Sequence, residues 1–247
     1  MLSAEKVRIS FIFNYIYMKG KTMFIDKEDE NIFSKIAKEA TRSAGLKLGE
    51  SVSSSYATKE DTARVKYGLN KLGYYDEPEK TGMNTIPDEQ MFDGIKDFQK
   101  DNGLQVDGRL KPFGETINKI NEGLKEGLKM VKESALAGYD MTKNYFDMKT
   151  DKTIGGDDYF HCKANYEATE RGKYGEMFAE KVGDAKEIFD YYRNQYRKGL
   201  SEQEAFDDFV HDTEVNRDGR RLAKSGLYSS SKEGCNKYRL EDINDRY

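Results

Sequence analysis

The chain has 247 residues, of which 36% are hydrophobic and 35% charged, and its formal net charge is −4. A disordered chain is excluded, because 17 Tyr and 13 Phe supply large apolar groups for a core. The charge balance argues against nucleic acid as a partner, and the absence of any apolar run of 18 residues argues against a membrane-spanning helix.

The N-terminal region has an apolar run, residues 9–17, preceded by two basic residues. It loosely imitates a signal peptide but is short and lacks a small-residue cleavage site. Met18 or Met23 is an alternative start of the chain. The export route is therefore left open.

Residues 26–47 carry apolar side chains at helical spacing, which predicts a short amphipathic helix. Gly45, Gly49 and the serine-rich residues 51–55 then predict a flexible linker. We interpret residues 1–57 as an N-terminal arm with one helix and a linker.

Residues 58–122 have the pattern of a small three-helix domain. Thr58 and Asp61 predict a capped helix start, and Gly73 predicts its left-handed end. A loop with two prolines separates this helix from a second one, and a third short helix begins near Ile117.

Residues 123–225 predict four longer helices joined by short loops, which favours an antiparallel four-helix bundle. The third helix has the most regular apolar stripe, predicted to face the core, and a Ser201–Glu204 capping box precedes the fourth. That stripe comprises Phe178, Val182, Ala185, Phe189, Tyr192 and Tyr196. The polar tail, residues 226–247, is either extended over the bundle or disordered. The predicted fold class is all-α.

Cys162 and Cys235 are too few for a disulfide framework. They either pair in an oxidising compartment or remain two unrelated thiols. His161 and His211 are the only histidines, and no Cys/His spacing typical of a metal site exists, so no metal or cofactor is predicted.

The region from Thr58 to Ile120 has a characteristic order of apolar, aromatic and glycine residues. They are Val65, Leu69, Leu72, Gly73, Tyr74, Tyr75, Phe92, Ile95, Phe98, Gln99, Gly103, Leu104, Val106, Asp107, Gly108, Pro112 and Thr116. With these residues the region resembles the type-1 peptidoglycan-binding domain. One departure is the loop of residues 82–90, which replaces the family's usual loop.

This resemblance implies peptidoglycan as a partner, bound by exposed aromatic, amide and carboxylate groups. In the structural alternative, Tyr74 belongs to the core, Gln99 caps a helix and Asp107 only forms a turn. The candidate binding residues are Tyr74, Tyr75, Gln99, Asp101, Asn102 and Asp107.

Residues from about 124 to 225 contain a second characteristic series. It comprises Asp140, Met141, Tyr145, Asp147, Met148, Ile154, Gly155, Tyr159, Phe160, His161, Asn165, Tyr166, Glu167, Ala168, Arg171, Gly172, Gly175, Ala179, Glu180, Asp184, Ala185, Asp212, Asn216, Gly219 and Arg220. With these residues the region resembles serum amyloid A, a family with a four-helix fold. Phe178 stands where that family has tryptophan, and Tyr174 replaces a glycine.

Polar residues within this region are predicted to form a buried network. The favoured interpretation is a scaffold that sets the register of the bundle. The alternative is an active site with His161, Glu180 and Asp212 as the catalytic residues; Cys162 lies on another helix face, which excludes it as a partner of His161. The network residues are His161, Asn165, Glu180, Asp184, Asp212, Asn216 and Arg220.

Together these features predict a non-catalytic protein of the bacterial cell envelope, periplasmic or extracellular. It binds peptidoglycan through its first domain. The second resemblance implies a lipid, a small apolar ligand or a protein partner, and a homo-oligomer. A wall-lytic effector or lysin with a catalytic bundle is the alternative, and a module that has lost its wall ligand is a third.

Overall fold

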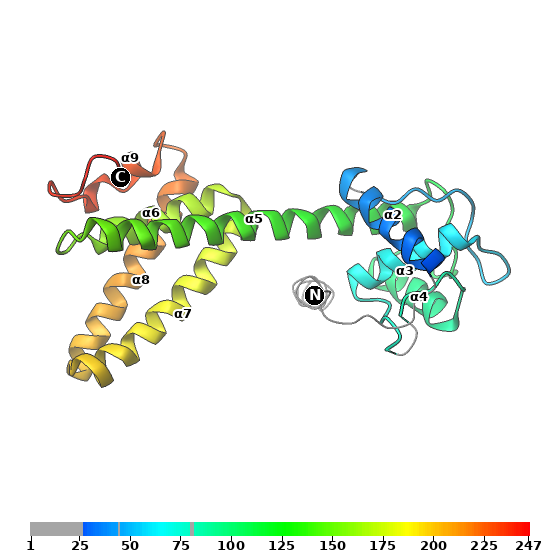
Figure 1. Ribbon diagram of the computed structural model, residues 1–247, viewed down its shortest axis with the longest axis horizontal. Helices are drawn as coiled ribbons and strands as arrows, with labels where there is room; N and C mark the ends of the chain where they lie inside the picture. The colour runs from blue at the N-terminus through cyan, green and yellow to red at the C-terminus, as the bar shows by residue number, and fades with distance from the viewer. Residues whose placement is uncertain (1–26, 44, 80–81) are drawn as a thin grey trace. The chain divides into compact units, whose positions relative to one another are not determined.

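A computed structural model describes residues 27–43, 45–79 and 82–247, and these are helical with no strand (Figure 1). The all-α prediction is confirmed. The apolar run of residues 9–17 lies outside the described residues. The α-helices are α2 (Lys27–Ser43), α3 (Lys59–Leu72), α4 (Glu89–Asp101), α5 (Glu115–Asp151), α6 (Asp157–Glu170), α7 (Lys173–Lys198), α8 (Glu202–Ser225) and α9 (Ser231–Gly234), followed by the 3-10 helix η1 (Asn236–Tyr238).

The chain divides into two compact units, residues 1–131 and 132–247. The division falls inside α5, a continuous helix of 37 residues. Two separate helices and a domain boundary at residues 122–123 were expected there, but no proline interrupts the segment and no break in the helix marks that boundary.

The first unit contains the segment that the sequence analysis assigned to a flexible linker. That assignment is wrong, because Leu46, Leu48 and Val52 are buried in the core with α2, α3, α4 and the first part of α5. Val52 and Leu110 exchange backbone hydrogen bonds of 2.8 and 3.0 Å. This pairing over a long sequence distance holds the glycine- and serine-rich segment in place.

Capping at both ends of α3 confirms the local prediction. The Thr58 hydroxyl accepts a hydrogen bond from the Asp61 amide at 3.1 Å, and Gly73 adopts φ 80°. The Asp61 carboxylate also accepts the backbone N–H groups of Gly49 and Glu50, both at 2.9 Å. The helix start therefore also anchors the preceding segment.

The loop that departs from the peptidoglycan-binding pattern is held from inside by Lys66. This lysine is fully buried, and its Nζ donates to Asn84 Oδ1 at 3.0 Å, to the Ile86 carbonyl at 2.6 Å and to the Asp88 carboxylate. A buried ammonium requires such partners. The substituted loop is thus an anchored part of the fold.

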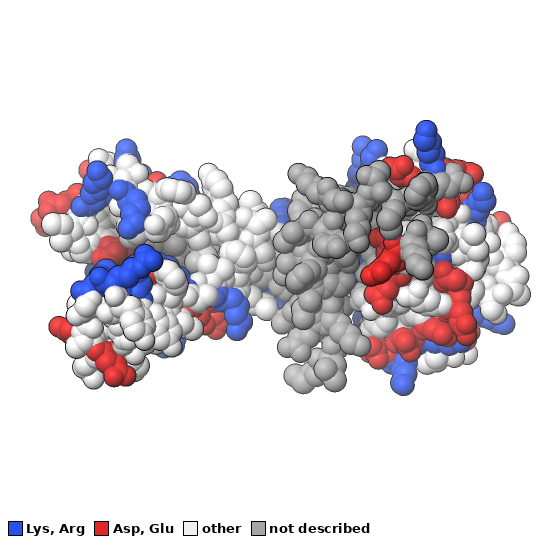
Figure 2. Space-filling model, turned by 60° about the horizontal axis from the view of Figure 1, so that its bottom comes forward, with Lys and Arg blue, Asp and Glu red and all other residues white. Residues whose placement is uncertain are grey.

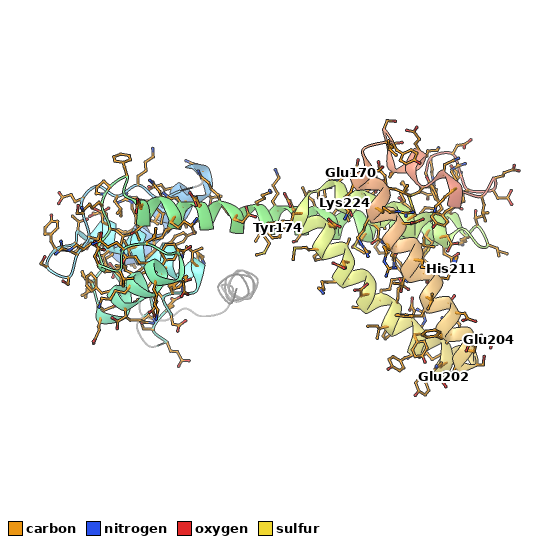
Figure 3. All side chains as sticks on the ribbon, turned by 180° about the vertical axis from the view of Figure 1, so that it is seen from behind. Glu170, Tyr174, Glu202, Glu204, His211 and Lys224 are labelled. Carbon is orange, nitrogen blue, oxygen red and sulfur yellow. A yellow bond between two sulfur atoms is a disulfide. The ribbon has the colours of Figure 1, made fainter. Side chains whose placement is uncertain are left out.

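In the second unit, α6 is much shorter than α7 and α8, with 14 residues against 26 and 24. Asp158, in the first turn of α6, lies opposite His211 in the middle of α8. The α7–α8 hairpin therefore extends past α6, and Figure 3 shows Glu202 and Glu204 at its far end, beyond His211. Among the helices described for this unit, none besides α7 and α8 covers the far half of the hairpin (Figure 1).

This geometry overturns the prediction that the apolar stripe of α7 faces the core, except at Phe178, which is half-buried and packs against the core cluster of Ala137, Ala168 and Ala179. Phe189 is 64% exposed and Tyr196 is 81% exposed, and Val182, Ala185 and Tyr192 are exposed as well. The face of α7 that is buried instead consists of small and polar residues. They are Tyr174, Gly175, Ala179, Gly183, Glu187 and Asn194.

The C-terminal tail packs on the bundle. Cys162 of α6 and Cys235 form a disulfide, so the open question of their pairing is answered. Ile243 and Tyr247 are buried, and the Tyr159 hydroxyl donates to the Tyr247 carbonyl at 2.9 Å. Within the described residues, no helix combines the length and apolar character that a membrane crossing requires.

Replacing both cysteines, as Cys162→Ser with Cys235→Ser, is expected to lower the free energy of unfolding of the second unit by about 4 kcal/mol. The disulfide closes a loop of 73 residues, and opening it restores chain entropy to the unfolded state. Urea unfolding followed by circular dichroism measures the change. Reduced wild-type protein serves as the control; equal midpoints for its oxidised and reduced forms would contradict the prediction.

Candidate functional site

A cleft of about 320 Å³ lies where the turn after α3 meets α4. The Tyr74 hydroxyl donates to Asp101 Oδ2 at 3.1 Å, and its ring packs edge-on against Phe98 with the centroids 5.2 Å apart. Burial, with the Asp101 carboxylate, raises the pKa of Tyr74 to about 12. The residues that line the cleft are Leu72, Gly73, Tyr74, Tyr75, Asp76, Gln90, Asp97, Lys100 and Asp101.

Several predicted wall-binding residues instead hold the frame together. Tyr75 is 2% exposed and donates to Asp88 Oδ2 at 3.0 Å. Gln99 is buried, and its amide oxygen accepts the backbone N–H groups of Asp107 and Gly108 at 3.1 and 2.9 Å.

The remaining two candidates also make structural contacts. Asn102 donates to the Phe98 carbonyl at the end of α4, and Asp107 accepts from the Gln99 side chain. Of the six candidates, Tyr74, Tyr75 and Asp101 line the cleft, and Tyr74 and Asp101 are the two that are not buried.

The cleft also has polar residues that sequence reasoning missed: Asp76, Gln90, Asp97 and Lys100. Three of these lie on α4, whose outward face could have been identified from its helical period. Three carboxylates, those of Asp76, Asp97 and Asp101, outnumber the single ammonium. The cleft therefore favours groups that donate hydrogen bonds or carry positive charge.

In the second unit a chain of buried side chains connects three helices. Arg220 Nη1 donates to Asn165 Oδ1 at 2.8 Å, Asn165 Nδ2 donates to Asn216 Oδ1 at 2.6 Å, and Asn216 Nδ2 donates to Glu187 Oε1 at 2.9 Å. The close approach of α6 and α8 requires Gly219, since a Cβ there would lie 2.3 Å from the Cys162 carbonyl oxygen. The chain links α8, α6 and α7.

Glu180 and Asp184, which were predicted to belong to this network, are exposed. Their place is taken by Glu187, which the sequence analysis missed. The apolar stripe was assumed to point inward, and that assumption placed the wrong face of α7 in the bundle. Ala179, Gly183 and Glu187, at intervals of four residues, define the inward face.

His161 and Asp212 meet beside Glu187. His161 Nδ1 lies 3.6 Å from Glu187 Oε1, and burial with the Lys186 ammonium lowers the pKa of this histidine. Burial, the Glu187 charge and a hydrogen bond to Glu187 raise the pKa of Asp212 to about 8. At neutral pH the imidazole is therefore neutral, and the Asp212 carboxyl beside Glu187 favours its protonated form.

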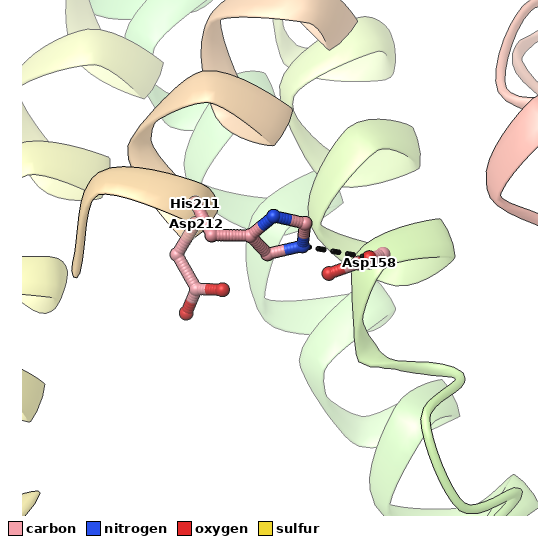
Figure 4. Close-up of side chains that lie close together, drawn as sticks. All are labelled: Asp158, His211 and Asp212. Atoms are coloured by element: carbon pink, nitrogen blue, oxygen red, sulfur yellow. Dashed lines mark hydrogen bonds and ion pairs between the residues drawn. The ribbon is translucent and has the colours of Figure 1, made fainter. Parts of the chain in front are cut away.

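The second histidine lies nearer the surface. His211 Nε2 is 2.9 Å from Asp158 Oδ2, and this contact raises the pKa of His211 (Figure 4). Asp212 is the next residue along α8. One of its carboxylate oxygens lies within 4.8 Å of a ring nitrogen of His211 and of a carboxylate oxygen of Asp158. A carboxylate oxygen of Asp212 also lies within 4.8 Å of a ring nitrogen of His161 and of a carboxylate oxygen of Glu187.

His161 also lies between two cavities. One is a small apolar pocket of about 60 Å³, walled partly by Met141, Tyr145, Met148 and Phe160. The other is a cleft of about 670 Å³, and Figure 2 shows basic side chains gathered on one face of this unit. The basic residues of the larger cleft are Lys149, Lys152, Lys186, Arg193 and Lys198.

The raised pKa of Asp212 predicts a pH-dependent stability. Between its ordinary value of 3.8 and about 8, the folded protein binds more protons than the unfolded chain, so the free energy of unfolding falls as pH rises. Asp212→Asn keeps a hydrogen-bond donor toward Glu187 and removes this dependence.

Urea unfolding from about pH 7 to 8.5 compares the free energies of unfolding of wild type and Asp212→Asn. Below this range the titration of His161 makes stability rise with pH, which would oppose the effect of Asp212. Wild-type stability is expected to fall more steeply than that of Asp212→Asn. The matched control is Asp184→Asn, an exposed acid on α7 that should retain the wild-type slope. Parallel curves for wild type and Asp212→Asn would refute the assignment.

Two family models match the chain. Residues 58–112 match the peptidoglycan binding domain, and residues 128–247 match the serum amyloid A protein. The structure describes both matched regions except for residues 80 and 81.

Similar proteins match the C-terminal half. A serum amyloid A protein of Equus caballus is 32% identical over 120 residues, which is 49% of this chain and 99% of that protein. Those of Notamacropus eugenii and Anas platyrhynchos are 30% and 35% identical over 124 and 102 residues, covering 84% and 74% of their lengths and 50% and 41% of this chain.

Proposed function

We propose that this chain is a non-catalytic protein with two binding surfaces. The premise is that it belongs to the serum amyloid A family and carries a peptidoglycan-binding domain ahead of the family's region. The first unit binds peptidoglycan. The second unit binds a lipid surface or another amphipathic apolar ligand. The observation that carries the second part is the uncovered aromatic face of the α7–α8 hairpin.

For the first unit, the cleft beside Tyr74 supports contact with the stem peptides of the wall. An aromatic ring provides an apolar surface, and Asp76, Asp97 and Asp101 accept hydrogen bonds from amides and attract free amino groups. Stem peptides offer both kinds of group. The anchored loop at residues 82–88 keeps the neighbouring frame rigid.

For the second unit, large apolar side chains are exposed along one end of the hairpin and on α5. Contiguous exposed apolar surface on a folded protein marks an interaction site. The neighbouring cleft has five basic side chains beside four aspartates, and those basic side chains offer the opposite charge to an anionic head group. The exposed apolar residues are Tyr139, Tyr145 and Phe146 on α5, Val182, Ile188, Phe189, Tyr192 and Tyr196 on α7, and Phe206 and Val210 on α8.

We further propose an extracytoplasmic, oxidising setting, which the Cys162–Cys235 disulfide supports. The similar proteins named above come from a horse, a wallaby and a duck, so they lend no support to the bacterial cell envelope expected from sequence.

The wall-binding proposal predicts that Tyr74→Ala and Asp101→Asn each weaken binding to purified sacculi by roughly tenfold, which corresponds to about 1.4 kcal/mol. Both groups lie in the cleft and their loss removes an apolar contact or an acceptor. Co-sedimentation at increasing sacculus concentration measures the affinity. Tyr196→Ala, an exposed tyrosine of the other unit, is the matched control and should bind like wild type.

Analysis of the supernatants tests the wall-lytic alternative in the same experiment. The feature that favours catalysis is Asp212, whose pKa is raised to about 8 and which lines the large cleft. We expect sedimentation without release of soluble muropeptides. Release that Asp212→Asn abolishes would establish the enzyme instead, and a failure of wild type to sediment would refute wall binding.

The lipid proposal predicts that Phe189→Ser with Tyr192→Ser weakens binding to vesicles containing anionic lipid by at least about tenfold. Burying one aromatic side chain contributes roughly 1.5–3 kcal/mol. Vesicle flotation at low and high salt separates the apolar from the charge contribution. Tyr74→Ala is the matched control here, and equal flotation of wild type and the double variant would contradict the proposal.

A further inference from the structure

Three helices each bring one potential metal ligand to the same point in the second unit. His161 comes from α6, Glu187 from α7 and Asp212 from α8, and one coordinating atom of each lies within 4.8 Å of the other two. His161 Nδ1 and Glu187 Oε1 are 3.6 Å apart. A tetrahedral ion with ligand bonds of about 2.0–2.2 Å holds neighbouring ligand atoms roughly 3.4 Å apart.

We propose that His161, Glu187 and Asp212 bind one divalent first-row transition metal ion, with Zn²⁺ as the best-matched ion. One imidazole and two carboxylates suit Zn²⁺ better than Mg²⁺ or Ca²⁺, which prefer oxygen ligands alone. Three protein ligands leave a fourth position for water. His161 and Asp212 both line the larger cleft, which provides a path of entry.

The protonation state of the cluster suits this role. His161 is neutral at neutral pH, as a ligand must be. Two carboxyl groups this close repel each other when both are charged, and a cation bound between them relieves that repulsion. The Asp212 carboxyl, whose pKa burial and Glu187 raise to about 8, loses its proton when the ion binds, so binding near pH 7 releases about one proton for each ion.

The charged groups around the cluster are compatible with an ion. The Lys186 ammonium lies 3.2 Å from Glu187 Oε2, but it also lies 2.9 Å from Asp190 Oδ2, which keeps it paired when Glu187 turns to a metal. Asp157, Asp158 and Asp208 add negative charge on the other sides.

Groups outside the ligand set orient Glu187. Asn216 donates to its Oε1 at 2.9 Å, and Asn216 is held in turn by Asn165 at 2.6 Å. Such hydrogen bonds to a carboxylate ligand restrict its orientation before the ion arrives. The polar chain that connects the helices therefore also prepares the site.

A second set, formed by Asp158, His211 and Asp212, is a weaker alternative. His211 is exposed and already makes a hydrogen bond of 2.9 Å to Asp158, which raises its pKa and favours the protonated form that cannot bind a metal. In the first set Glu187 is buried and held by Asn216, and His161 and Asp212 are half-buried, whereas in this one His211 is exposed. We therefore assign the ion to the set that contains Glu187.

The test uses the full chain without an affinity tag, titrated with Zn²⁺ in a calorimeter near pH 7 in two buffers of different ionisation enthalpy. One ion for each chain and release of about one proton are expected. Asp212→Asn and His161→Gln should each weaken the affinity at least about tenfold. Circular dichroism of the metal-free variants checks that they are folded. If His161→Gln does not fold, Asp212→Asn still tests the site, because its amide can donate to Glu187.

Two controls locate the site. Asp184→Asn changes an exposed acid on α7, and His211→Asn removes the other histidine; both should bind Zn²⁺ like wild type. Binding lost in His211→Asn but retained in His161→Gln would overturn the assignment. So would equal affinities for wild type and Asp212→Asn, or no binding at Zn²⁺ concentrations up to about 0.1 mM.

Discussion

The second unit depends on the hydrogen bond between two buried amides, Asn165 of α6 and Asn216 of α8. At 2.6 Å it joins helices that approach closely because Gly219 has no side chain to separate them. Each amide has a further partner, Arg220 on one side and Glu187 on the other. Buried polar groups destabilise the fold when they lose a partner, so the register of three helices is set by this chain.

One consequence is that α7 turns its polar face inward. Glu187 must reach Asn216, and the residues one and two turns before it, Gly183 and Ala179, then face the bundle. The apolar stripe on the opposite face, with Phe189 and Tyr196, is left to solvent. The same rotation therefore creates both the buried His161 cluster and the exposed aromatic surface, which are the two features that carry the functional proposals.

Local features of the fold could be predicted from sequence, whereas features that depend on distant partners could not. The caps at Thr58, Gly73 and the Ser201–Glu204 box each require only neighbouring residues, and each is present. The segment containing Val52 looks like a linker because its partner, Leu110, lies far along the chain. The pairing of Cys162 and Cys235 could not be predicted either, because the two cysteines lie 73 residues apart in the sequence.

The errors in the candidate sites have a common cause: polar residues were assumed to be exposed and apolar residues were assumed to be buried. In the first unit, the polar residue Gln99 was assigned to a binding surface, but it is buried and accepts two backbone N–H groups of a tight turn. In the second unit, the apolar stripe of α7 was assigned to the core, but the short α6 leaves its far half uncovered. A small domain has few backbone partners for its loops, and a short helix has little surface to cover its neighbours. Buried polar side chains therefore belong to the frame of both units, and in the second unit several aromatic side chains remain available for binding.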